Sequence, residues 1–347
     1  MNDGDPKELD RTPIRMGIIG AGGIARGFHL RELTAVPGVD VVACADVDEA
    51  TARETAAQFG IPQVYTAYQD LLAREEIDAV VVATPHSLHA PIAMEAFAAR
   101  KHVLVQKPMA TRREDADRLV EAYHNSGRVG MALPYLFSPA FVAGRDLIRQ
   151  GAIGRPVMAH ARVAHSGPGR DRWFYQKAIA HGGALFDMGV YAVAALTTLL
   201  GPACHVSAMT TTTDPAADVD ENAALLVRFA HGALGTVETS WRQQAGREVA
   251  IVYGTAGTVQ IEMAHWRQAV ELFSTDAAAG ERRGWLRMEP PHLPRGLPTA
   301  HHHFIDSIRA GTVPWATIEQ GRHVSEILIA GYEAAASGQT IELQTAF

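Results

Sequence analysis

A glycine-rich turn between a strand-like run and a helix-like stretch constrains the fold of this chain more than any other feature. The run Met16–Ile19 leads into Gly20-Ala21-Gly22-Gly23-Ile24-Ala25, and a helix is predicted over 23–36. The first glycine permits a tight turn, the second allows close approach to the backbone, and the small Ala25 keeps helix and strand together. This arrangement is typical of the first βαβ unit of a parallel sheet.

The residues that follow continue the alternation of strands and helices. The further strand candidates are Val39–Ala45, Ala79–Ala83, Val103–Val105 and Arg128–Ala132, and the helix candidates are 48–58, 87–99 and 112–125. Strands that alternate with helices form βαβ units, which build a parallel sheet. We therefore expect a doubly wound Rossmann sheet over 14–133, preceded by a charged, flexible tail at 1–13.

The pattern changes after Pro134. A helix at 139–150, an extended segment at Arg155–His165 and a helix that begins near Asp187 are followed by runs rich in Thr and Val. These runs are 203–213, 222–229, 233–241, 247–254 and 257–261, and after them come a Pro-rich connector at 290–298 and helices at 299–310 and 318–336. Consecutive strands without intervening helices predict an antiparallel meander, so 134–347 is expected to be an α+β domain.

Composition limits the classes of function. The 347 residues exceed the roughly 250–300 at which a single core stops growing, which favours two domains. A net charge of −7 without a basic run argues against nucleic acid as a partner. We see no apolar run near the ~20 residues of a membrane helix and no signal-peptide core, so we expect a cytoplasmic protein. Cys44 and Cys204 make neither a disulfide framework nor a metal set.

The residue that ends the second predicted strand indicates a dinucleotide. Asp46 lies twenty-four positions after Gly22, near the spacing of the acid that binds a ribose 2′-hydroxyl. A carboxylate there repels the extra phosphate of NADP, and no arginine directly follows it. We therefore predict NAD rather than NADP, with the phosphates on the turn formed by Gly20, Gly22, Gly23 and Ile24.

Lys107 directly follows the buried strand Val103–Val105, where Pro108 ends the run. In open α/β sheets ligands bind at this edge. Only four of the 31 basic residues are lysine, and lysine, unlike arginine, can share a proton with a substrate. The alternative is a lysine that lies on a loop by chance.

The second dense motif is Gly182–Tyr191. Asp187 can cap or open a helix, and Tyr191 lies four residues later on the same face. We expect this face to meet Lys107 across the cleft between the domains. An ammonium nearby favours the phenolate of a tyrosine, whose ordinary pKa is ~10. The alternative is a structural cap followed by a buried tyrosine.

The order of these motifs resembles the glucose–fructose oxidoreductase / inositol dehydrogenase (Gfo/Idh/MocA) family over nearly all of the chain from Ile14. The resemblance rests on the glycine turn, on Asp46, and on segments 83–89, 106–110, 182–191 and 303–311. It implies a Rossmann domain and a C-terminal domain with an open, mostly antiparallel sheet for substrate binding. The outer face of that sheet would join a homodimer or homotetramer. The coenzyme contacts that it implies are Thr84, Pro85, His86, His89 and Gln106.

The chain departs from the family pattern at three positions. Gln106 replaces the glutamate of the usual Glu-Lys-Pro triplet, which removes a carboxylate beside Lys107. Tyr191 stands where many members carry histidine, as in the glucose–fructose oxidoreductase and dihydrodiol dehydrogenase branches, where the tyrosine is taken as the acid/base. His86 replaces a frequent asparagine. The resemblance implies that Lys107, Tyr191 and Asp187 are the catalytic residues.

The loop before the Asp187 helix supplies candidates for substrate contact. They are His165, Arg172, Trp173, Lys177 and His181. A tryptophan face stacks on a sugar ring, although a core anchor is an equal alternative for Trp173. The run 301–303 is three consecutive histidines, which point in different directions on a helix, so we expect no metal site.

The leading hypothesis is an NAD-dependent oxidoreductase that transfers hydride between nicotinamide and a hydroxyl or keto carbon of a sugar, glycoside or cyclitol. Tyr191 would exchange the hydroxyl proton, Lys107 would bind the same oxygen, and Asp187 would orient the substrate or the lysine. One alternative is a glycoside-cleaving enzyme that retains NAD and works by transient oxidation. A further alternative is a non-catalytic ligand sensor of the same fold, which is expected to lose the lysine or the acid/base residue.

Overall fold

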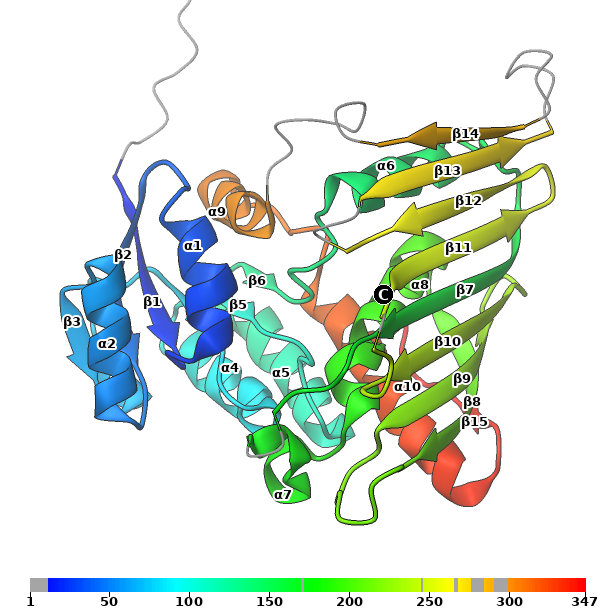
Figure 1. The fold of residues 1–347 in the computed structure, drawn as a ribbon. Coiled ribbons are helices and arrows are strands. Elements are labelled where there is room, and N and C mark those ends of the chain that lie inside the picture. Colours follow the sequence, from blue (N-terminus) through cyan, green and yellow to red (C-terminus); the bar gives the residue numbers. More distant parts are fainter. Residues whose placement is uncertain (1–11, 170–171, 245, 265–267, 276–283, 290–298) are drawn as a thin grey trace, which may run out of the picture.

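The chain folds into two sheets that lie next to each other, a smaller one from its first third and a larger one from the remainder (Figure 1). The computed structural model describes residues 12–347 except 170–171, 245, 265–267, 276–283 and 290–298. Most of the tail predicted at 1–13, and all of the connector predicted at 290–298, lie outside the described residues.

The smaller sheet is parallel throughout, with the order β3-β2-β1-β4-β5-β6. Its strands are β1 (Ile14–Ile19), β2 (Val39–Ala45), β3 (Gln63–Tyr65), β4 (Ala79–Val82), β5 (His102–Val105) and β6 (Gly130–Met131). The order reverses between β1 and β4, so the predicted doubly wound Rossmann sheet is confirmed. All four residues of β4 are buried, as expected of a central parallel strand.

Short helices flank this sheet. They are η1 (Ala25–His29), α1 (Leu30–Leu33), α2 (Glu49–Phe59), α3 (Tyr68–Leu72), η2 (His86–Leu88), α4 (His89–Ala98) and α5 (Arg113–Ser126). The Asp48 carboxylate accepts a hydrogen bond from the Ala50 N–H and starts α2, and Gly60 ends it in the left-handed conformation. β3 and α3 were not predicted, because three and five residues are too few for a periodic pattern.

The larger sheet has the order β14-β13-β12-β11-β7-β10-β9-β8-β15. Its strands are β7 (Pro156–Ala164), β8 (Ala203–Thr211), β9 (Asn222–Phe229), β10 (Leu234–Ser240), β11 (Glu248–Gly254), β12 (Gly257–Glu262), β13 (Ala269–Ser274), β14 (Trp285–Met288) and β15 (Ile341–Glu342). The predicted antiparallel meander is interrupted, because β7 inserts between β10 and β11 and pairs with β10 in parallel. The other pairs are antiparallel, so the sheet is mostly antiparallel as predicted.

Helices cover one face of the larger sheet (Figure 1). They are α6 (Pro139–Arg149), α8 (Val190–Leu200) and α10 (Ile318–Ser337), which pack on β12, β7 and β8 respectively. The helix α9 (Ala300–Ala310) instead contacts α1 of the first sheet. The chain therefore returns to the Rossmann domain near its end, where α9 contacts α1 and α10 packs on α5.

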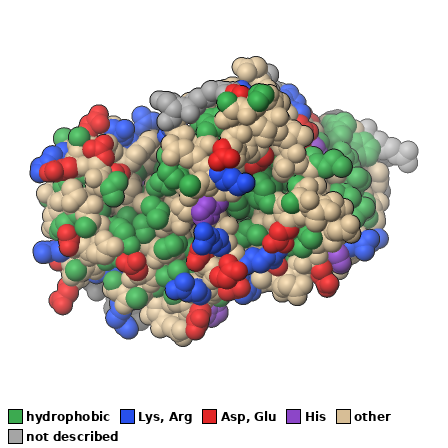
Figure 2. Space-filling model, turned by 90° about the horizontal axis from the view of Figure 1, so that it is seen from below, with side chains coloured by type: hydrophobic (Ala, Val, Ile, Leu, Met, Phe, Trp, Pro, Cys, Tyr) green, Lys and Arg blue, Asp and Glu red, His purple; other side chains and the backbone are tan. Residues whose placement is uncertain are grey.

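Among the described residues, the stretch Lys177–Leu200 is long and apolar enough to cross a membrane. This corrects the expectation that no apolar run reaches that length. Within its apolar window 89% of the residues are buried inside the fold, so this stretch is the core helix of the larger domain. On the face drawn in Figure 2, acidic and basic side chains lie interspersed rather than gathered by sign.

Candidate active site

Two cavities adjoin at the carboxyl edge of the Rossmann sheet. The first, the glycine-turn groove, has a volume of about 480 Å³. The second, the Lys107 cavity, has a volume of about 450 Å³ and reaches the helix that carries Asp187 and Tyr191. Both cavities are lined by Gly23, Ile24, Thr84, Arg172, Trp173 and Phe174. A ligand in the groove therefore lies directly beside a ligand in the Lys107 cavity.

The glycines of the turn serve different purposes. Gly20 has a φ of +91°, and a Cβ on it would lie 2.5 Å from the carbonyl oxygen of Ala83, at the end of β4. A Cβ on Gly22 or Gly23 would meet nothing within 4 Å. Gly20 is thus required by the fold, whereas Gly22 and Gly23 leave open space beside the start of η1. Backbone N–H groups at a helix start attract phosphate, so a pyrophosphate fits this space.

Asp46 lines the groove and directly follows β2. Its carboxylate accepts hydrogen bonds from the N–H of Ala21 at 2.8 Å and of Asp48 at 3.0 Å. The glycine turn itself therefore positions this acid. The neighbouring Asp48 adds a second negative charge at this end of the groove.

The loop after β4 presents unsatisfied polar atoms to the two cavities. Thr84 Oγ1 and His86 Nδ1 are buried without a hydrogen-bond partner. Buried polar atoms are nearly always hydrogen-bonded, so these two atoms are candidates to bind a ligand or water. Burial, followed by the charge of Lys107, lowers the pKa of His86 well below 6.5 and keeps its ring neutral. Pro85 lines the groove, and the ring nitrogens of His89 contact the carbonyls of Pro108 at 2.8 Å and Thr84 at 2.6 Å.

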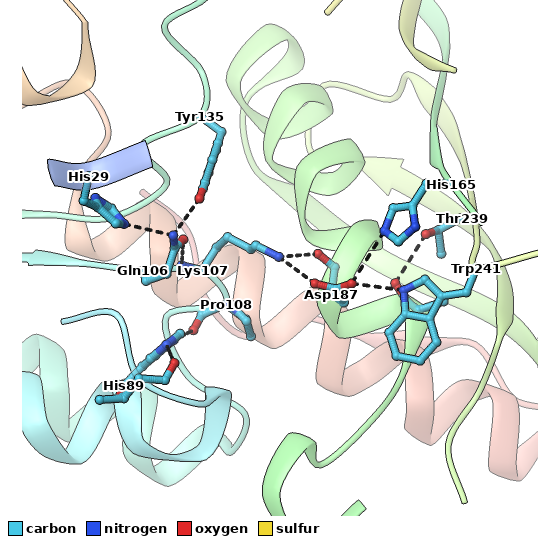
Figure 3. A network of polar contacts seen from close by, with 12 residues as sticks. His29, His89, Gln106, Lys107, Pro108, Tyr135, His165, Asp187, Thr239 and Trp241 are labelled. Carbon is cyan, nitrogen blue, oxygen red and sulfur yellow. Dashed lines mark hydrogen bonds and ion pairs between the residues drawn. The ribbon is translucent and has the colours of Figure 1, made fainter. Parts of the chain in front are cut away.

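Lys107 and Asp187 form a buried ion pair in the wall of the Lys107 cavity (Figure 3). Lys107 Nζ donates to Asp187 Oδ1 at 2.8 Å and to the Asp187 carbonyl at 2.7 Å. The indole N–H of Trp241 donates to Asp187 Oδ2 at 3.0 Å. The side chains of Lys107 and Asp187 are only 10% and 9% exposed, so each charge depends on the other.

Asp187 belongs to a π-helical turn, η4 (Leu185–Gly189), which leads directly into α8. Its carboxylate makes no capping hydrogen bond, so the predicted cap is wrong and only the opening of a helix is right. Burial raises the pKa of Asp187, but the Lys107 ammonium outweighs it, and the net pKa is below 3.8. The structure thus supports a carboxylate that positions the lysine.

Tyr191 lies against the same ammonium, with Lys107 Nζ 4.6 Å from the ring centroid. The expectation that the ammonium favours phenolate is not met. Burial, followed by the charges of Asp187 and Glu248, raises the pKa of Tyr191 well above 10. Burial, with these two negative charges, therefore favours the protonated phenol, which can donate a proton.

Gln106 is buried and fully engaged. Its carbonyl oxygen accepts from the N–H of Lys107 at 2.6 Å, and its amide nitrogen contacts His29 Nε2 at 3.0 Å and the Tyr135 hydroxyl at 2.6 Å. Gln106 lines the Lys107 cavity and does not line the groove among the described residues. The predicted contact of Gln106 with the coenzyme therefore requires the coenzyme to extend from the groove into the Lys107 cavity.

Of the predicted substrate residues, the structure brings three together. His165, Arg172 and Trp173 line the Lys107 cavity, and His165 Nε2 lies 3.9 Å from Asp187 Oδ2. Trp173 stacks on Phe174 at 3.9 Å and meets His86 edge to face at 4.8 Å, so it lies between groove and cavity.

Lys177 and His181 are not among the described residues that line the Lys107 cavity. Lys177 is exposed at the start of the short helix α7 (Lys177–Ala180). His181 Nδ1 pairs with Thr111 Oγ1 at 2.8 Å outside the cavity. The contact of these two residues with substrate stays a prediction, which the lining of the Lys107 cavity does not support.

The three consecutive histidines on α9 have different partners. His301 bonds to His29 and Glu32, His302 lies beside Thr299, and His303 accepts from the N–H of Trp315. Among the described residues no group of three His, Cys, Asp or Glu is arranged to hold a metal ion.

Sequence reasoning missed Tyr135 and Trp241, which contact the predicted residues directly. Each follows the end of a strand: Tyr135 comes four residues after β6, and Trp241 follows β10 at once. Tyr135 lies at the same carboxyl edge as Lys107, so its position after β6 was a usable signal. For Trp241 no signal was available, because its contact with Asp187 depends on the packing of β10 against η4, which is far away in the chain.

Two family models match the chain. Residues 14–133 match the oxidoreductase family with an NAD-binding Rossmann fold, and residues 141–260 match the GFO/IDH/MocA C-terminal domain.

Among curated proteins, the chain is 30% identical to 1,5-anhydro-D-fructose reductase of Ensifer adhaerens, over 95% of this chain and 99% of that protein. It is 31% identical to trans-1,2-dihydrobenzene-1,2-diol dehydrogenase of Mus musculus, over 72% of this chain and 74% of that one.

Two solved structures are similar over nearly the whole chain. GenD2 from gentamicin A biosynthesis, in complex with NAD, has a TM-score of 0.83 and 32% identity, covering 96% of this chain and 97% of that one. Levoglucosan dehydrogenase in complex with NADH has a TM-score of 0.88 at 24% identity, covering 96% and 100%. The latter likeness concerns the fold alone.

Proposed function

Because the chain belongs to the Gfo/Idh/MocA family of oxidoreductases, we propose that it transfers hydride between NAD and a CH–OH or keto carbon of a sugar or cyclitol. One observation carries this proposal. The buried pair of Lys107 and Asp187 and the protonated phenol of Tyr191 line a cavity that adjoins the glycine-turn groove.

The groove fits a dinucleotide. Gly22 and Gly23 leave open space where a pyrophosphate would lie, and Thr84, which also lines the groove, has an unpartnered Oγ1. Asp46 would bind the ribose hydroxyls, and its charge disfavours a 2′-phosphate. NAD is therefore the proposed coenzyme in preference to NADP. When bound, its nicotinamide accepts or supplies the hydride.

The side chains of the Lys107 cavity would handle the proton. In reduction, Tyr191 donates its phenolic proton to the substrate oxygen, while Lys107 donates a hydrogen bond to the same oxygen and stabilises its developing charge. In oxidation the same proton returns to Tyr191. Asp187 pairs with Lys107, and Trp241 fixes the Asp187 carboxylate from behind. This arrangement gives Asp187 the role of positioning the lysine.

The proposed substrate is a polyol ring. Relatives by sequence include the 1,5-anhydro-D-fructose reductase named above and an inositol 2-dehydrogenase of Rubrobacter xylanophilus, 30% identical over 73% of this chain. The cavity wall supports this class, because His165 and Arg172 offer polar contacts beside the aromatic face of Trp173.

The proposal includes a homodimer or homotetramer formed through the larger sheet. The sheet face opposite the helices carries exposed apolar side chains, among them Met158, Met209, Leu226, Leu234 and Tyr253. The proposed compartment is the cytoplasm, and both cysteines are free thiols, as is usual there. Light scattering of the wild type and of Leu226→Glu tests the assembly, since a charge on this face should reduce the mass to that of one chain.

The experiment that tests the function supplies purified protein with NAD or NADP and a panel of anhydrosugars, aldoses and inositols. We expect absorbance of reduced coenzyme to rise with NAD and at least one sugar or cyclitol. Release of an aglycone from a glycoside without net reduction of NAD would instead favour the glycoside-cleaving alternative. Failure to bind either coenzyme would contradict the proposal.

A further inference from the structure

A continuous chain of polar contacts runs from Glu32 at the surface to Tyr135, whose ring meets that of Tyr191 (Figure 3 shows the central part of the chain). It passes through His301, His29 and Gln106. The successive donor–acceptor distances from Glu32 to Tyr135 are 2.6, 2.8, 3.0 and 2.6 Å. Neither the hydride transfer nor the binding of coenzyme described above uses it.

Gln106 fixes the direction of this chain. The Lys107 N–H can only donate, so the amide atom 2.6 Å from it must be the Gln106 carbonyl oxygen. The other amide atom is then the NH₂ group, which can only donate. One of its hydrogens goes to His29 Nε2 and the other to the Tyr135 oxygen.

The direction of the hydrogen bonds between Gln106 and Glu32 follows from the orientation of the Gln106 amide. His29 accepts at Nε2 and therefore carries its proton on Nδ1, from which it donates to His301 Nε2. His301 then donates from Nδ1 to the Glu32 carboxylate. Burial, followed by the charge of His301, lowers the pKa of His29 well below 6.5, in agreement with a neutral ring. The histidines thus hold Gln106 in one orientation.

On the other side of Gln106, the contacts lead through Tyr135 toward Tyr191, the proposed acid. Since the Tyr135 oxygen accepts from Gln106, its hydroxyl hydrogen is free to donate, and Tyr191 is the neighbouring phenol that lines the same small cavity. The two rings meet edge to face with centroids 4.9 Å apart. The two phenols line a small cavity together with four apolar residues, Leu133, Leu136, Val190 and Ala194.

The charged and titratable groups that face Tyr191 come from four elements. Lys107 lies in the loop after β5, Asp187 in η4, Glu248 on β11 and Tyr135 after β6. Burial, Asp187 and Glu248 raise the pKa of Tyr191, whereas the hydrogen bond from Tyr135 lowers it. Tyr135 is therefore a neutral group that stabilises negative charge on the Tyr191 oxygen.

We infer that Tyr135, oriented by Gln106, is a positioning residue that donates to the Tyr191 oxygen and so directs the Tyr191 proton at the substrate oxygen. The catalytic consequence of this inference rests on the proposed function, whereas the placement of Gln106 and Tyr135 beside Tyr191 rests on the contacts alone. In reduction the Tyr191 O–H bond breaks, the proton joins the substrate oxygen, and the phenolate that remains keeps the hydrogen bond from Tyr135. In oxidation the same bond stabilises the base.

A glutamine at position 106 is essential to this polarity. A glutamate there would accept from Tyr135 instead of donating to it, and the Tyr135 hydrogen would turn away from Tyr191. Gln106→Glu should therefore affect Tyr191 as Tyr135→Phe does. The Gln106→Glu/Tyr135→Phe double variant should be no worse than the more impaired single variant, because both remove one hydrogen bond.

The first test uses ligand-free protein labelled with ¹³C at Cζ of its eight tyrosines. Tyr191→Phe identifies the Tyr191 signal by its loss. We expect this signal to move in Tyr135→Phe and in Gln106→Glu, and to stay in Tyr123→Phe, which removes a half-buried hydroxyl on α5. Because Tyr135→Phe keeps the ring, packing is unchanged. A Tyr191 signal that does not move in Tyr135→Phe overturns the inference.

The second test measures oxidation against pH. Tyr135→Phe should lower kcat about tenfold at neutral pH, the worth of one hydrogen bond to a charged oxygen, with KM nearly unchanged. Because a hydrogen bond from Tyr135 stabilises the phenolate, the apparent pKa of the oxidation profile should be higher in Tyr135→Phe than in the wild type, and the loss should shrink only as pH approaches that pKa. An apparent pKa that Tyr135→Phe leaves unchanged would show a merely structural role and overturn the inference. Movement of the NMR signal without any NAD-linked activity would contradict the proposed function and leave the hydrogen bond standing.

Discussion

The glycine-turn groove and the Lys107 cavity share a wall but are built in different ways. The groove is made by backbone: open space at Gly22 and Gly23, and one acid held by the turn itself. The Lys107 cavity is made by side chains: Lys107 follows β5, Asp187 lies on η4 and Tyr191 on α8, and Trp241 holds the Asp187 carboxylate. Coenzyme binding and the chemical step are therefore separable, and a substitution in one of the two cavities should affect one of them without the other.

Asp187→Asn should have the largest effect. It leaves the Lys107 ammonium buried without its carboxylate, which destabilises the fold by about 3–5 kcal/mol, the cost of breaking a buried pair. We expect kcat to fall by about 10³, within the range of groups that position an acid or a base. Thermal unfolding and steady-state rates measure the two effects, and NAD affinity should stay within about twofold. An equal loss of NAD affinity would contradict the separation.

Tyr191→Phe should lower kcat by about 10²–10³, because the proton donor is lost while the ring and the ion pair remain. In the wild type, burial, followed by the charges of Asp187 and Glu248, raises the pKa of Tyr191 well above 10. The phenolate base is then scarce at neutral pH, so the oxidation rate should climb with pH through 9. A flat profile, or a variant that keeps near-normal turnover, would remove Tyr191 from the mechanism.

The groove can be tested with a matched pair of glycine substitutions. Gly20→Ala would place a Cβ 2.5 Å from the Ala83 carbonyl oxygen and forces a φ of +91° on alanine, so it should destabilise the protein by about 2–3 kcal/mol. Gly22→Ala meets no protein atom and should fold normally, yet weaken NAD about tenfold by filling the phosphate space. Calorimetry and denaturant titration distinguish them. Equal stability of the two variants would contradict the structure.

Asp46→Ser should have the smallest effect of the four. Removing this charge from the groove should weaken NAD several-fold and narrow the preference for NAD over NADP by about tenfold. Affinities for both coenzymes provide the measurement, and Asp40→Ser on the exposed side of β2 is the control. An unchanged ratio would mean that Asp46 does not select the coenzyme.

The same contrast explains what could be predicted from sequence. The groove is local, so a turn, a spacing and a terminal acid were enough to predict it. Lys107 and Asp187 were predicted, but the direction of the Tyr191 pKa was wrong, because burial, followed by the charges of Asp187 and Glu248, decides it. Trp241 and the place of β7 were missed because they depend on contacts between strands that are far apart in the chain.

The most direct test of the central claim is single-turnover hydride transfer in Lys107→Met, with Lys177→Met as the control for loss of an exposed lysine. With NAD affinity measured on the same samples, we predict that Lys107→Met binds NAD as the wild type does and transfers hydride at least about 10²-fold more slowly. Lys177→Met should match the wild type in both. A Lys107→Met protein that transfers hydride at a rate near that of the wild type would contradict the account.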